Sequence, residues 1–506
     1  MGVIVFTSYI LLINSLAVIF AQDPIGLRVS ASLRGLLVGT AADVVLLKQN
    51  VDDGQYISNI KKNYQLIVAE NEMKPRHIWW GDNIYNFTDP DWLIGGAPST
   101  TGWIQQNGLQ IRGHNLLWAR DTVIPTWLLE KESSITPDKA KSLLSDYIHT
   151  VVARYRGKIE WWDVVNEAID DQTNQNPLNL RNCFWFRKLG PDFMKYAFIF
   201  AHEADPNLKL YYNEYGIERI GLKANRTVEL IKWLRSQGAT VHGVGLQYHV
   251  QVGNSMTPGD EYYQSAQQFI DNNLDIMVTE LDISVAMKNG QPVNPNDIIQ
   301  QGVIYRQHLQ FVFHFAARCP AMLTWGFTDK YSWIPSASHN TEGDALPLDV
   351  SYKPKPAYWQ LQEELARSLV DGVYCLSPQS QSDQYLGTSQ NPTSASVQLY
   401  QGQCNQANEK WNVTWLGDGT YRLSPLSNTT LALYTSNANA TVGQVQVSSW
   451  SNNYDQEWVL TLQGNNGYRV GPRNAWSRVM TVYETTNVAI VDYSRSGNQN
   501  WILRSV

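Results

Sequence analysis

The chain has 506 residues, more than one ordinary domain holds, so two or more domains are expected. Its formal net charge of −7, without any basic run, argues against a nucleic-acid partner. The 19 tryptophans and 26 tyrosines are a heavy load. Core packing accounts for many of these side chains. Flat aromatic faces are also surfaces on which sugar rings stack, so the composition favours carbohydrate chemistry.

The first twenty-odd residues have the pattern of a secretory signal peptide. Residues Val3 to Phe20 form an apolar run that ends at Ala21, and the chain then turns polar at Gln22-Asp23-Pro24. This pattern predicts a signal peptide at residues 1–21 that is cleaved near Ala21. An uncleaved membrane anchor is the alternative, which the polar residues inside the run weaken. After cleavage we expect a secreted protein without membrane contact.

The cysteines and the glycosylation sequons agree with a secretory route. Four cysteines are an even number, which suits an oxidising compartment. Cys375 and Cys404 both lie in the last third of the chain and can pair there. Cys183 and Cys319 are then left to each other or free. Acceptor sequons for N-glycosylation occur at Asn86, Asn225, Asn412, Asn428 and Asn439.

Between Leu36 and Asp329, apolar strand-like runs alternate with amphipathic helical patterns. The runs are Leu36–Ala42, Leu66–Ala69, Leu109–Leu117, Ile159–Val165, Leu208–Tyr212, Val241–Leu246, Ile276–Thr279 and Met322–Phe327. The helical patterns include Pro137–Tyr155, Pro191–Ala204, Ala224–Gln237, Tyr263–Asn272 and Asp297–Ala317. Eight strand–helix units in about 330 residues predict an α/β fold, a (β/α)8 TIM barrel.

Polar residues gather at the carboxyl ends of these runs, where a barrel of this kind carries its chemistry. They are Glu70-Asn71, His114-Asn115, Asn166-Glu167, Asn213-Glu214, Gln247-Tyr248-His249, Glu280 and Asp329. Glu167 and Glu280 each close a dense β-branched run. Either glutamate alone is typical of a solvated turn residue. Two carboxylates delivered by two strands of one barrel are what hydrolysis of a glycosidic bond requires.

After Leu365 the long amphipathic segments give way to short polar ones with internal repetition. A segment at Gly372–Pro378 recurs at Gly419–Pro425 and at Gly467–Pro472. Each repeat closes on a tryptophan within Glu-Lys-Trp, Gln-Glu-Trp or Gln-Asn-Trp, at Trp411, Trp458 and Trp501. Three repeats of short strands predict an all-β body of threefold symmetry, in which these tryptophans fill a shared core.

This second part resembles a ricin-type β-trefoil with its Gln-x-Trp signature, over about residues 370–506. Sugar-binding repeats of that family usually carry an aspartate after the first turn. The corresponding stretches, Tyr385–Gly387, Leu431–Tyr434 and Val479–Val482, lack one. We therefore expect a rigid accessory body that binds carbohydrate weakly if at all. Its candidate stacking residues are Tyr400, Trp450 and Tyr493.

The barrel motifs resemble glycoside hydrolase family 10, the endo-β-1,4-xylanases. The motifs that carry the resemblance occur in order as Glu70–Lys74, Arg112–Trp118, Trp162–Glu167, Gly245–His249, Thr279–Asp282 and Thr328–Trp333. The resemblance implies a catalytic domain at residues 22–368, followed by the β-trefoil at 369–506. It implies a secreted, monomeric enzyme that hydrolyses internal bonds of xylan with retention of anomeric configuration.

By this resemblance Glu167 is the acid/base and Glu280 is the nucleophile. His249 and Asp282 would orient Glu280, which must stay ionised. Glu167 must begin protonated, which an apolar setting favours. Asn166 would bond the 2-hydroxyl of the sugar under attack.

The resemblance also implies a set of substrate-binding residues on the two sides of the scissile bond. Those of the glycone side are Glu70, Asn71, Lys74, His114 and Trp118, with Trp325 and Trp333 over the same sugar, Gln247 near the scissile bond, and Asn213 and Tyr215 on the leaving-group side. No His/Asp cluster has metal-ligand spacing, so neither a metal nor another cofactor is implied.

Two departures from the family pattern stand out. After Trp118 the family commonly has His-Ser-Gln, whereas this chain reads Ala119-Arg120-Asp121. We expect a glycone subsite that differs in strength or in tolerated side groups. Asn213-Glu214-Tyr215 replaces the more common Asn-Asp-Tyr; this exchange keeps the charge, and we expect it to matter little.

Two alternatives to a xylanase stay open. Glucose differs from xylose by one hydroxymethyl group, so a β-1,4-glucanase is the alternative within the enzyme class. A carbohydrate-binding protein without catalysis is the alternative from another class. The second is weaker, because both glutamates and the supporting His249 and Asp282 are present.

Overall fold

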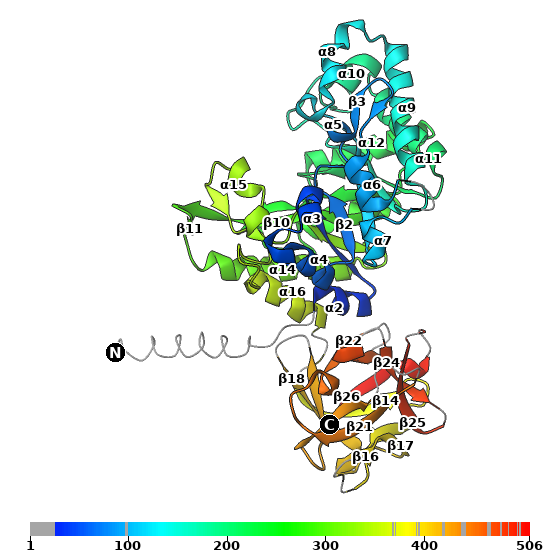
Figure 1. Cartoon of the computed structure of the whole chain (residues 1–506), viewed down its shortest axis with the longest axis vertical. Helices are drawn as coiled ribbons and strands as arrows, with labels where there is room; N and C mark the ends of the chain where they lie inside the picture. Colours follow the sequence, from blue (N-terminus) through cyan, green and yellow to red (C-terminus); the bar gives the residue numbers. More distant parts are fainter. Residues whose placement is uncertain are drawn as a thin grey trace. The chain divides into compact units, whose positions relative to one another are not determined.

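A computed structural model describes residues 26–506 of the chain apart from short gaps (Figure 1). The gaps are at 97–99, 367–368, 370, 391, 393–394, 417–419, 437–441, 463–466, 476–477, 484, 493 and 495–496. The predicted signal peptide at residues 1–21, the sequon at Asn439 and the candidate stacking residue Tyr493 lie outside the described residues. The chain divides into two compact units, Leu36–Gln360 and a second that joins Leu361–Val506 to the residues before Leu36.

Eight parallel strands close into a barrel in the first unit. Around the barrel they are β1 (Leu37–Ala42), β2 (Leu66–Ala69), β5 (Gln110–Trp118), β6 (Trp161–Asn166), β7 (Lys209–Glu214), β8 (Gly243–Leu246), β10 (Asp275–Lys288) and β12 (Ala321–Thr324). Each coincides with one of the eight predicted runs. The result is consistent with the predicted (β/α)8 fold.

Strand β10 is longer than predicted because it continues beyond the barrel rim. Its last residues pair with short strands that are β9 (His249–Gln251), β11 (Gln291–Pro292) and β13 (Glu342–Gly343). A separate small hairpin joins β3 (Trp79–Gly81) to β4 (Ile84–Tyr85). The sequence pattern ended the run at Thr279, since the polar residues that follow look like a loop. The extension places Glu280 and Asp282 on a continuous strand.

Helices connect the strands of this unit (Figure 1). From α3 onward they are α3 (Val44–Gln49), α4 (Gln55–Asn63), α5 (Pro75–Ile78), α6 (Thr88–Ile94), α7 (Trp103–Gln106), α8 (Thr126–Glu130), α9 (Pro137–Arg154), α10 (Phe184–Leu189), α11 (Asp192–Ala204), α12 (Leu222–Ser236), α13 (Glu261–Asp271), α14 (Asp297–His314) and α15 (Ile334–Ala337). Two further helices are α2 (Leu27–Leu33), which precedes β1, and α16 (Pro356–Ala366), which crosses the boundary between the two units.

Helix α9 illustrates why the sequence folds this way. Thr136 accepts a hydrogen bond from the Lys139 amide at 3.2 Å, and Pro137 takes the first helical position, where no amide hydrogen is needed. The helix buries one apolar stripe, which includes Leu144 and Ile148. All five predicted helical patterns of the barrel are helices in the structure, with ends that differ by up to three residues.

The second unit is all β. Six strands form a closed antiparallel barrel, namely β14 (Gly372–Pro378), β18 (Lys410–Trp415), β19 (Tyr421–Pro425), β22 (Trp458–Leu462), β23 (Tyr468–Pro472) and β26 (Trp501–Ser505). Three hairpins form a further sheet, made of β15 (Gln384–Gly387) with β17 (Gln398–Gln401), β20 (Leu431–Ser436) with β21 (Gly443–Ser449), and β24 (Arg478–Tyr483) with β25 (Asn487–Asp492). A short strand, β16 (Ala395–Ser396), pairs with β21.

The three tryptophans of the sequence repeat occupy equivalent places in this unit. Trp411, Trp458 and Trp501 are all fully buried in one hydrophobic core. Each indole N–H donates a 2.8 Å hydrogen bond to a backbone carbonyl of its own repeat, at Leu386, Leu433 and Met480 respectively. The tryptophans therefore pack the core, as predicted, and their faces are not available to a sugar.

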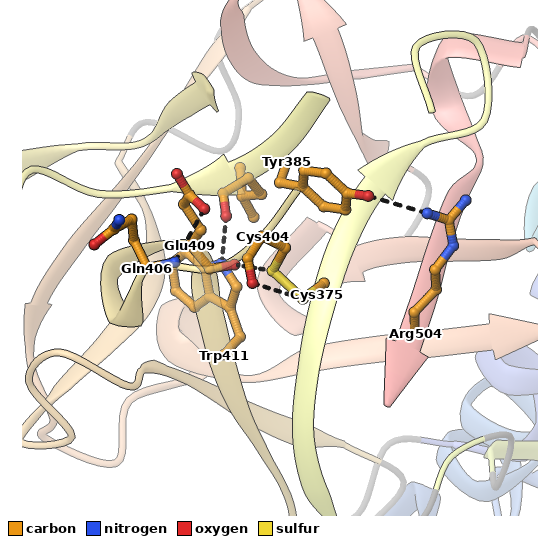
Figure 2. The surroundings of a disulfide bond; sticks show 8 residues. Cys375, Tyr385, Cys404, Gln406, Glu409, Trp411 and Arg504 are labelled. Atoms are coloured by element: carbon orange, nitrogen blue, oxygen red, sulfur yellow. Dashed lines mark hydrogen bonds between the residues drawn. A yellow bond between two sulfur atoms is a disulfide. The ribbon is translucent and has the colours of Figure 1, made fainter. Parts of the chain in front are cut away.

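A disulfide joins Cys375 on β14 to Cys404, in the loop after β17 (Figure 2). The two cysteines pack with the buried Tyr385, whose hydroxyl accepts a 3.1 Å hydrogen bond from Arg504. This is the pairing that the sequence suggested. Cys183 and Cys319 are free and buried.

We expect Trp458→Ala to destabilise the second unit by about 3–5 kcal/mol, because it removes a fully buried indole and leaves the Leu433 carbonyl without its partner. Hydrogen exchange of the β19–β23 amides in the full chain measures this locally. Trp450→Ala is the matched control, since it removes the same side chain from a half-buried position. Equal effects of the two substitutions would contradict the core role of Trp458.

Candidate active site

A pocket of about 720 Å³ opens at the carboxyl ends of the barrel strands. Thirteen of the residues predicted from the sequence line it, namely Glu70, Asn71, Lys74, His114, Trp118, Asn166, Glu167, Tyr215, Gln247, His249, Glu280, Trp325 and Trp333. These side chains come from strands up to 263 positions apart in the chain, counted from Glu70 to Trp333. The parallel barrel brings them together because every strand ends at the same rim.

Glu280 lies on β10 at the inner wall of the pocket. One carboxylate oxygen accepts a 2.6 Å hydrogen bond from the Asn213 amide, and the other lies 3.1 Å from the His249 Nε2. The opposite ring nitrogen of His249 lies 2.9 Å from Asp282. The three groups form a carboxylate–imidazole–carboxylate chain that holds Glu280 in one orientation.

The charges in this chain keep Glu280 ionised. Burial alone would raise the pKa of Glu280, but the hydrogen bond from His249, the charges of His114 and His249, and the Asn213 amide lower that pKa to about 2. Burial alone would lower the pKa of His249. Asp282 and Glu280 more than offset this effect and raise it well above its usual value. His249 is therefore a cation between two carboxylates, and Glu280 is available as an anion.

Glu167 faces the pocket from the end of β6. The residue has a φ of 55°, a left-handed conformation with which the chain leaves the strand. One carboxylate oxygen accepts a 2.6 Å hydrogen bond from the Arg120 Nε, and the other accepts a 3.1 Å bond from Gln247. Its side chain is 10% exposed, so Glu167 is nearly as buried as Glu280, whose side chain is 6% exposed.

Amide side chains connect the surroundings of the two glutamates. The Asn213 amide that donates to Glu280 also donates to the Asn166 carbonyl oxygen at 2.9 Å. The Gln247 amide donates to the same oxygen at 3.3 Å and to Glu167. Asn213, which the resemblance placed on the leaving-group side, is fully buried. Its amide instead orients Glu280, a role that the residue order alone could not reveal.

Lys74 brings a buried cation to the other wall of the pocket. Its ammonium lies 4.9 Å from the Trp118 ring and 5.5 Å from the Trp325 ring, and it donates to Asn71 at 3.1 Å. Burial lowers the pKa of Lys74. Burial raises the pKa of the neighbouring Glu70 to about 7, although Lys74 opposes the shift. Such side chains can donate to and accept from sugar hydroxyls.

Aromatic rings enclose the same region. Trp325 is nearly buried, whereas Trp333 is 38% exposed and donates from its indole N–H to Asp282 at 2.9 Å. The rings of His249 and Trp333 meet edge to face, with centroids 5.1 Å apart. His114 completes the floor, where its Nδ1 lies 2.9 Å from Asp163. Flat apolar faces beside these polar groups suit a pyranose ring.

Arg120 is a site residue whose place the sequence did not predict. The departure at Ala119-Arg120-Asp121 was expected to alter the glycone subsite. Instead the Arg120 guanidinium contacts Glu167 and donates to the Tyr215 hydroxyl at 2.7 Å. The departure from the family pattern at Arg120 marked this residue as unusual. The direction of its side chain could not be predicted, because it depends on the path of the loop after β5.

Glu214 also has more contacts than its conservative exchange suggested. It is fully buried, accepts from the Tyr212 hydroxyl at 2.6 Å and pairs with Lys223 at 3.0 Å. Burial raises the pKa of Glu214 to about 7, even though Lys223 opposes it. The residue braces the segment that carries Tyr215.

No group of three or more His, Cys, Asp or Glu side chains in the described part of the chain is arranged to hold a metal ion. Within the same described residues, no helix has the length and apolarity needed to cross a membrane.

The lowered pKa of Glu280 predicts a pH-dependent stability. Since the pKa is about 2 in the folded barrel and 4.5 ordinarily, the ionised group stabilises the fold above pH 4.5 and this contribution is lost as the pH falls towards 2. Between pH 5 and pH 3 we expect wild type to lose about 2 kcal/mol more unfolding free energy than Glu280→Gln. Urea unfolding of the barrel at both pH values measures this.

Glu70→Gln is the matched comparison, because Glu70 is a pocket carboxylate whose pKa is shifted the other way. Burial raises that pKa to about 7, so ionisation of Glu70 costs stability as the pH rises from 4.5 to 7. Wild type should therefore lose stability relative to Glu70→Gln in that window. The same pH dependence for both variants would contradict the assigned environments.

Comparison with known proteins gives a consistent answer for the barrel. Residues 26–364 match the description "Glycosyl hydrolase family 10". The chain is similar to the endo-1,4-beta-xylanase B of Thermotoga neapolitana, at 31% identity over 69% of this chain and 94% of that protein. It is similar at 30% identity to the exoglucanase XynX of Acetivibrio thermocellus, over 64% of this chain and 28% of that protein.

A solved structure agrees with these sequences. The crystal structure of xylanase 10B from Thermotoga petrophila RKU-1 in complex with xylobiose matches at 29% identity and a TM-score of 0.61, over 68% of this chain and 98% of that one. The matched family and the pocket of paired glutamates lie in the same part of the chain. The chain belongs to glycosyl hydrolase family 10.

Proposed function

We propose that the protein is an endo-β-1,4-xylanase that acts with retention of anomeric configuration. The single observation that carries the proposal is the contrast between the two pocket glutamates. Glu280 is buried and kept ionised by His249 and Asn213, as a nucleophile must be. Glu167 is held instead by the partly exposed Arg120 and by the Gln247 amide. The xylanase names of the similar proteins and the xylobiose-bound relative support xylan as the substrate.

In the first step the Glu280 carboxylate attacks the anomeric carbon of the sugar held beside Trp325. The bond from this carbon to the glycosidic oxygen breaks, and Glu167 gives its proton to that oxygen, so the leaving sugar departs as an alcohol. Asn213 and His249 hold the nucleophile in line. The product is a glycosyl ester on Glu280.

In the second step a water takes the place of the leaving sugar. Glu167, now a carboxylate, removes the proton of this water as its oxygen attacks the anomeric carbon. The ester bond to Glu280 breaks, and the carboxylate of Glu280 is restored. Two inversions at one carbon give net retention. Asn166, which is fixed by Asn213 and Gln247, is the side chain that we assign to the 2-hydroxyl.

A β-1,4-glucanase is the second candidate, since one relative is named an exoglucanase. An assay of reducing ends released from xylan, arabinoxylan, carboxymethylcellulose and mixed-linkage glucan separates the candidates. We expect release from both xylans and little from the glucans. Folded protein that releases nothing from any xylan would overturn the proposal.

The two glutamates should respond differently to substitution. Glu280→Ala should abolish turnover of every substrate, since no glycosyl ester can form. Glu167→Ala should spare the first step for aryl xylobiosides with good leaving groups, which need no protonation, and azide should accelerate its second step. The measurement is kcat and kcat/KM across a series of leaving groups, with and without azide.

Glu160→Ala is the control, because Glu160 is an exposed glutamate just before the same strand, at its other end. We expect near wild-type rates from this variant. Identical responses of the Glu167 and Glu280 variants to leaving group and azide would show that the roles are assigned wrongly.

We further propose that residues 369–506 form a β-trefoil that follows a catalytic domain at 22–368. The closed six-stranded barrel, the three hairpins and the three equivalent tryptophan contacts support this assignment. The family match, which ends at residue 364, supports the boundary.

The surface of this unit offers little for sugar binding. The stretches that lack the family aspartate lie in β15, β20 and β24, where Leu386, Leu433 and Met480 are fully buried. Of the candidate stacking residues, Trp450 already has the Arg422 guanidinium 4.8 Å from its ring centroid. We therefore propose a structural accessory unit with at most weak affinity for carbohydrate.

The full-length Glu280→Ala variant tests this without cleaving the resin. We expect no retention on galactose resin, and retention on insoluble xylan that short xylo-oligosaccharides reverse by filling the barrel pocket. Trp450→Ala in the same background should change neither result. Retention on galactose at micromolar dissociation constants, or xylan binding that the oligosaccharides do not release, would contradict it.

We also propose that the protein is secreted. The disulfide between Cys375 and Cys404 supports passage through an oxidising compartment. Of the predicted glycosylation sites, Asn225 on α12 is exposed. Mass spectrometry of the secreted chain should find its first residue near position 22, and an intact Met1 would contradict the predicted cleavage.

A further inference from the structure

Arg120 forms an ion pair with the glutamate to which we assign the acid/base role. Its Nε lies 2.6 Å from Oε2 of Glu167, and the Gln247 amide lies 3.1 Å from Oε1. Both oxygens of Glu167 therefore accept hydrogen bonds. The Asn166 amide also donates to Oε1, at 3.5 Å. Among these three donors only Arg120 is a permanent cation, because a guanidinium does not lose its proton in a protein.

The Arg120 guanidinium is fixed on its other side as well. Its Nη2 donates to the Tyr215 hydroxyl at 2.7 Å, and Arg181 donates to the same hydroxyl at 2.7 Å. That hydroxyl donates in turn to Asp171, which also pairs with Lys223 at 2.8 Å. The segment after β5 is thus attached to the segment that carries Tyr215, and Arg120 is held in place at the end of Glu167.

The reaction asks for both charge states of Glu167. Protonation of the leaving oxygen needs the neutral acid, whereas activation of the water needs the carboxylate. A cation in hydrogen-bond contact favours the carboxylate over the acid. Arg120 therefore helps the second step and opposes the first. Its Nε contacts Glu167 and its Nη2 contacts Tyr215, so its charge acts directly on the acid/base.

We infer that Arg120 is a positioning residue that orients the Glu167 carboxylate on the leaving-group side and keeps it ready to act as the base. The inference rests on the proposed function and names the residue that positions the acid/base of the enzyme. It also gives a meaning to the departure of the loop after Trp118 from the family pattern.

Other charged groups also act on Glu167, and the test must hold them constant. Lys74 and Glu214 interact with it electrostatically across the pocket. Arg181 donates to its backbone carbonyl at 3.0 Å, not to its carboxylate. Gln247, the second donor, is neutral. Among these groups Arg120 has the charge in direct contact, so substitution of Arg120 isolates the effect.

The first experiment compares pH profiles of wild type, Arg120→Met and Arg120→Lys. Methionine keeps much of the apolar stem and removes the charge, whereas lysine keeps the charge and loses the fork. For Arg120→Met we expect the alkaline limb of kcat/KM on xylan to move to higher pH by about half a unit or more. The acidic limb of kcat on an activated aryl xylobioside, which reports the second step, should move in the same direction.

The size of kcat and its rescue give an independent readout. On the activated aryl xylobioside, kcat of Arg120→Met should fall roughly tenfold, a part of what a general base contributes. Azide needs no base, so it should bring this variant close to the wild-type rate measured with azide. Arg120→Lys should lie between wild type and Arg120→Met.

Arg154→Met is the matched control. Arg154 is 33% exposed and pairs with Asp91 away from the pocket, whereas Arg120 is 34% exposed. We expect no movement of either limb in this variant. Limbs that stay fixed in Arg120→Met, or that move equally in Arg154→Met, would overturn the inference, as would a loss of kcat that azide does not restore.

A titration without substrate separates this inference from the proposed function. Carbon-13 NMR of the Glu167 side-chain carboxyl, assigned by the loss of its titration in Glu167→Gln, follows ionisation directly in the whole chain. We expect its midpoint to rise in Arg120→Met and to stay in Arg154→Met. A shifted midpoint in protein that cleaves no xylan would overturn the proposed function alone. An unshifted midpoint in active enzyme would overturn the role of Arg120 alone.

Discussion

The site depends on the solution to one electrostatic problem, a carboxylate that must remain charged while it is buried. Glu280 is 5% exposed, and burial alone would keep it neutral. The imidazolium of His249 compensates its charge, and Asp282 in turn keeps that imidazole protonated. Each member of this chain would be costly without the others. The residues that hold them in place, Asn213 and Trp333, are accordingly fixed by hydrogen bonds of their own.

The barrel can hold these charges because the residues that fix the pocket floor differ from the carboxylates that react. Arg112 and His114 on β5 both pair with Asp163 on β6 in the buried interior, so the floor of the pocket is an ion-paired layer. The reactive ends of Glu167 and Glu280 project above this layer from the strand termini. A network fixed from below lets the upper face stay open to a polysaccharide.

Much of this arrangement could be predicted from the sequence. The eight strands were readable because dense β-branched runs alternate with amphipathic segments, and the polar residues that follow each run marked the active rim. The threefold repeat with its three tryptophans predicted a second, all-β unit. The sequence could not indicate where each side chain points inside the pocket. Asn213 lies near the end of its strand, as Asn166 does, yet its amide lies against Glu280, because that contact depends on the registers of β7 with β8 and of β8 with β10.

The same limit explains why the contact between Arg120 and Glu167 could not be predicted. Its distance in sequence from Trp118 suggests the glycone wall, but the chain turns at Ala119, whose amide is bonded to the Asn166 carbonyl at 3.0 Å. That one backbone contact carries the loop after β5 across to β6 and presents Arg120 to Glu167. A hydrogen bond between two backbone groups cannot be predicted from the identity of the side chains.

The two glutamates therefore differ in a way that suits their tasks. The partners of Glu280 are fixed by hydrogen bonds of their own, Asn213 to Asn166 and His249 to Asp282, so Glu280 is held as an anion until it bonds to the sugar. The partners of Glu167 are a half-exposed arginine and a neutral amide, which can yield when a proton or a sugar arrives. A residue that changes charge twice per turnover needs such an adjustable environment. Glu280 has rigid partners and Glu167 has adjustable ones. This difference in surroundings lets two identical side chains act as nucleophile and as acid/base.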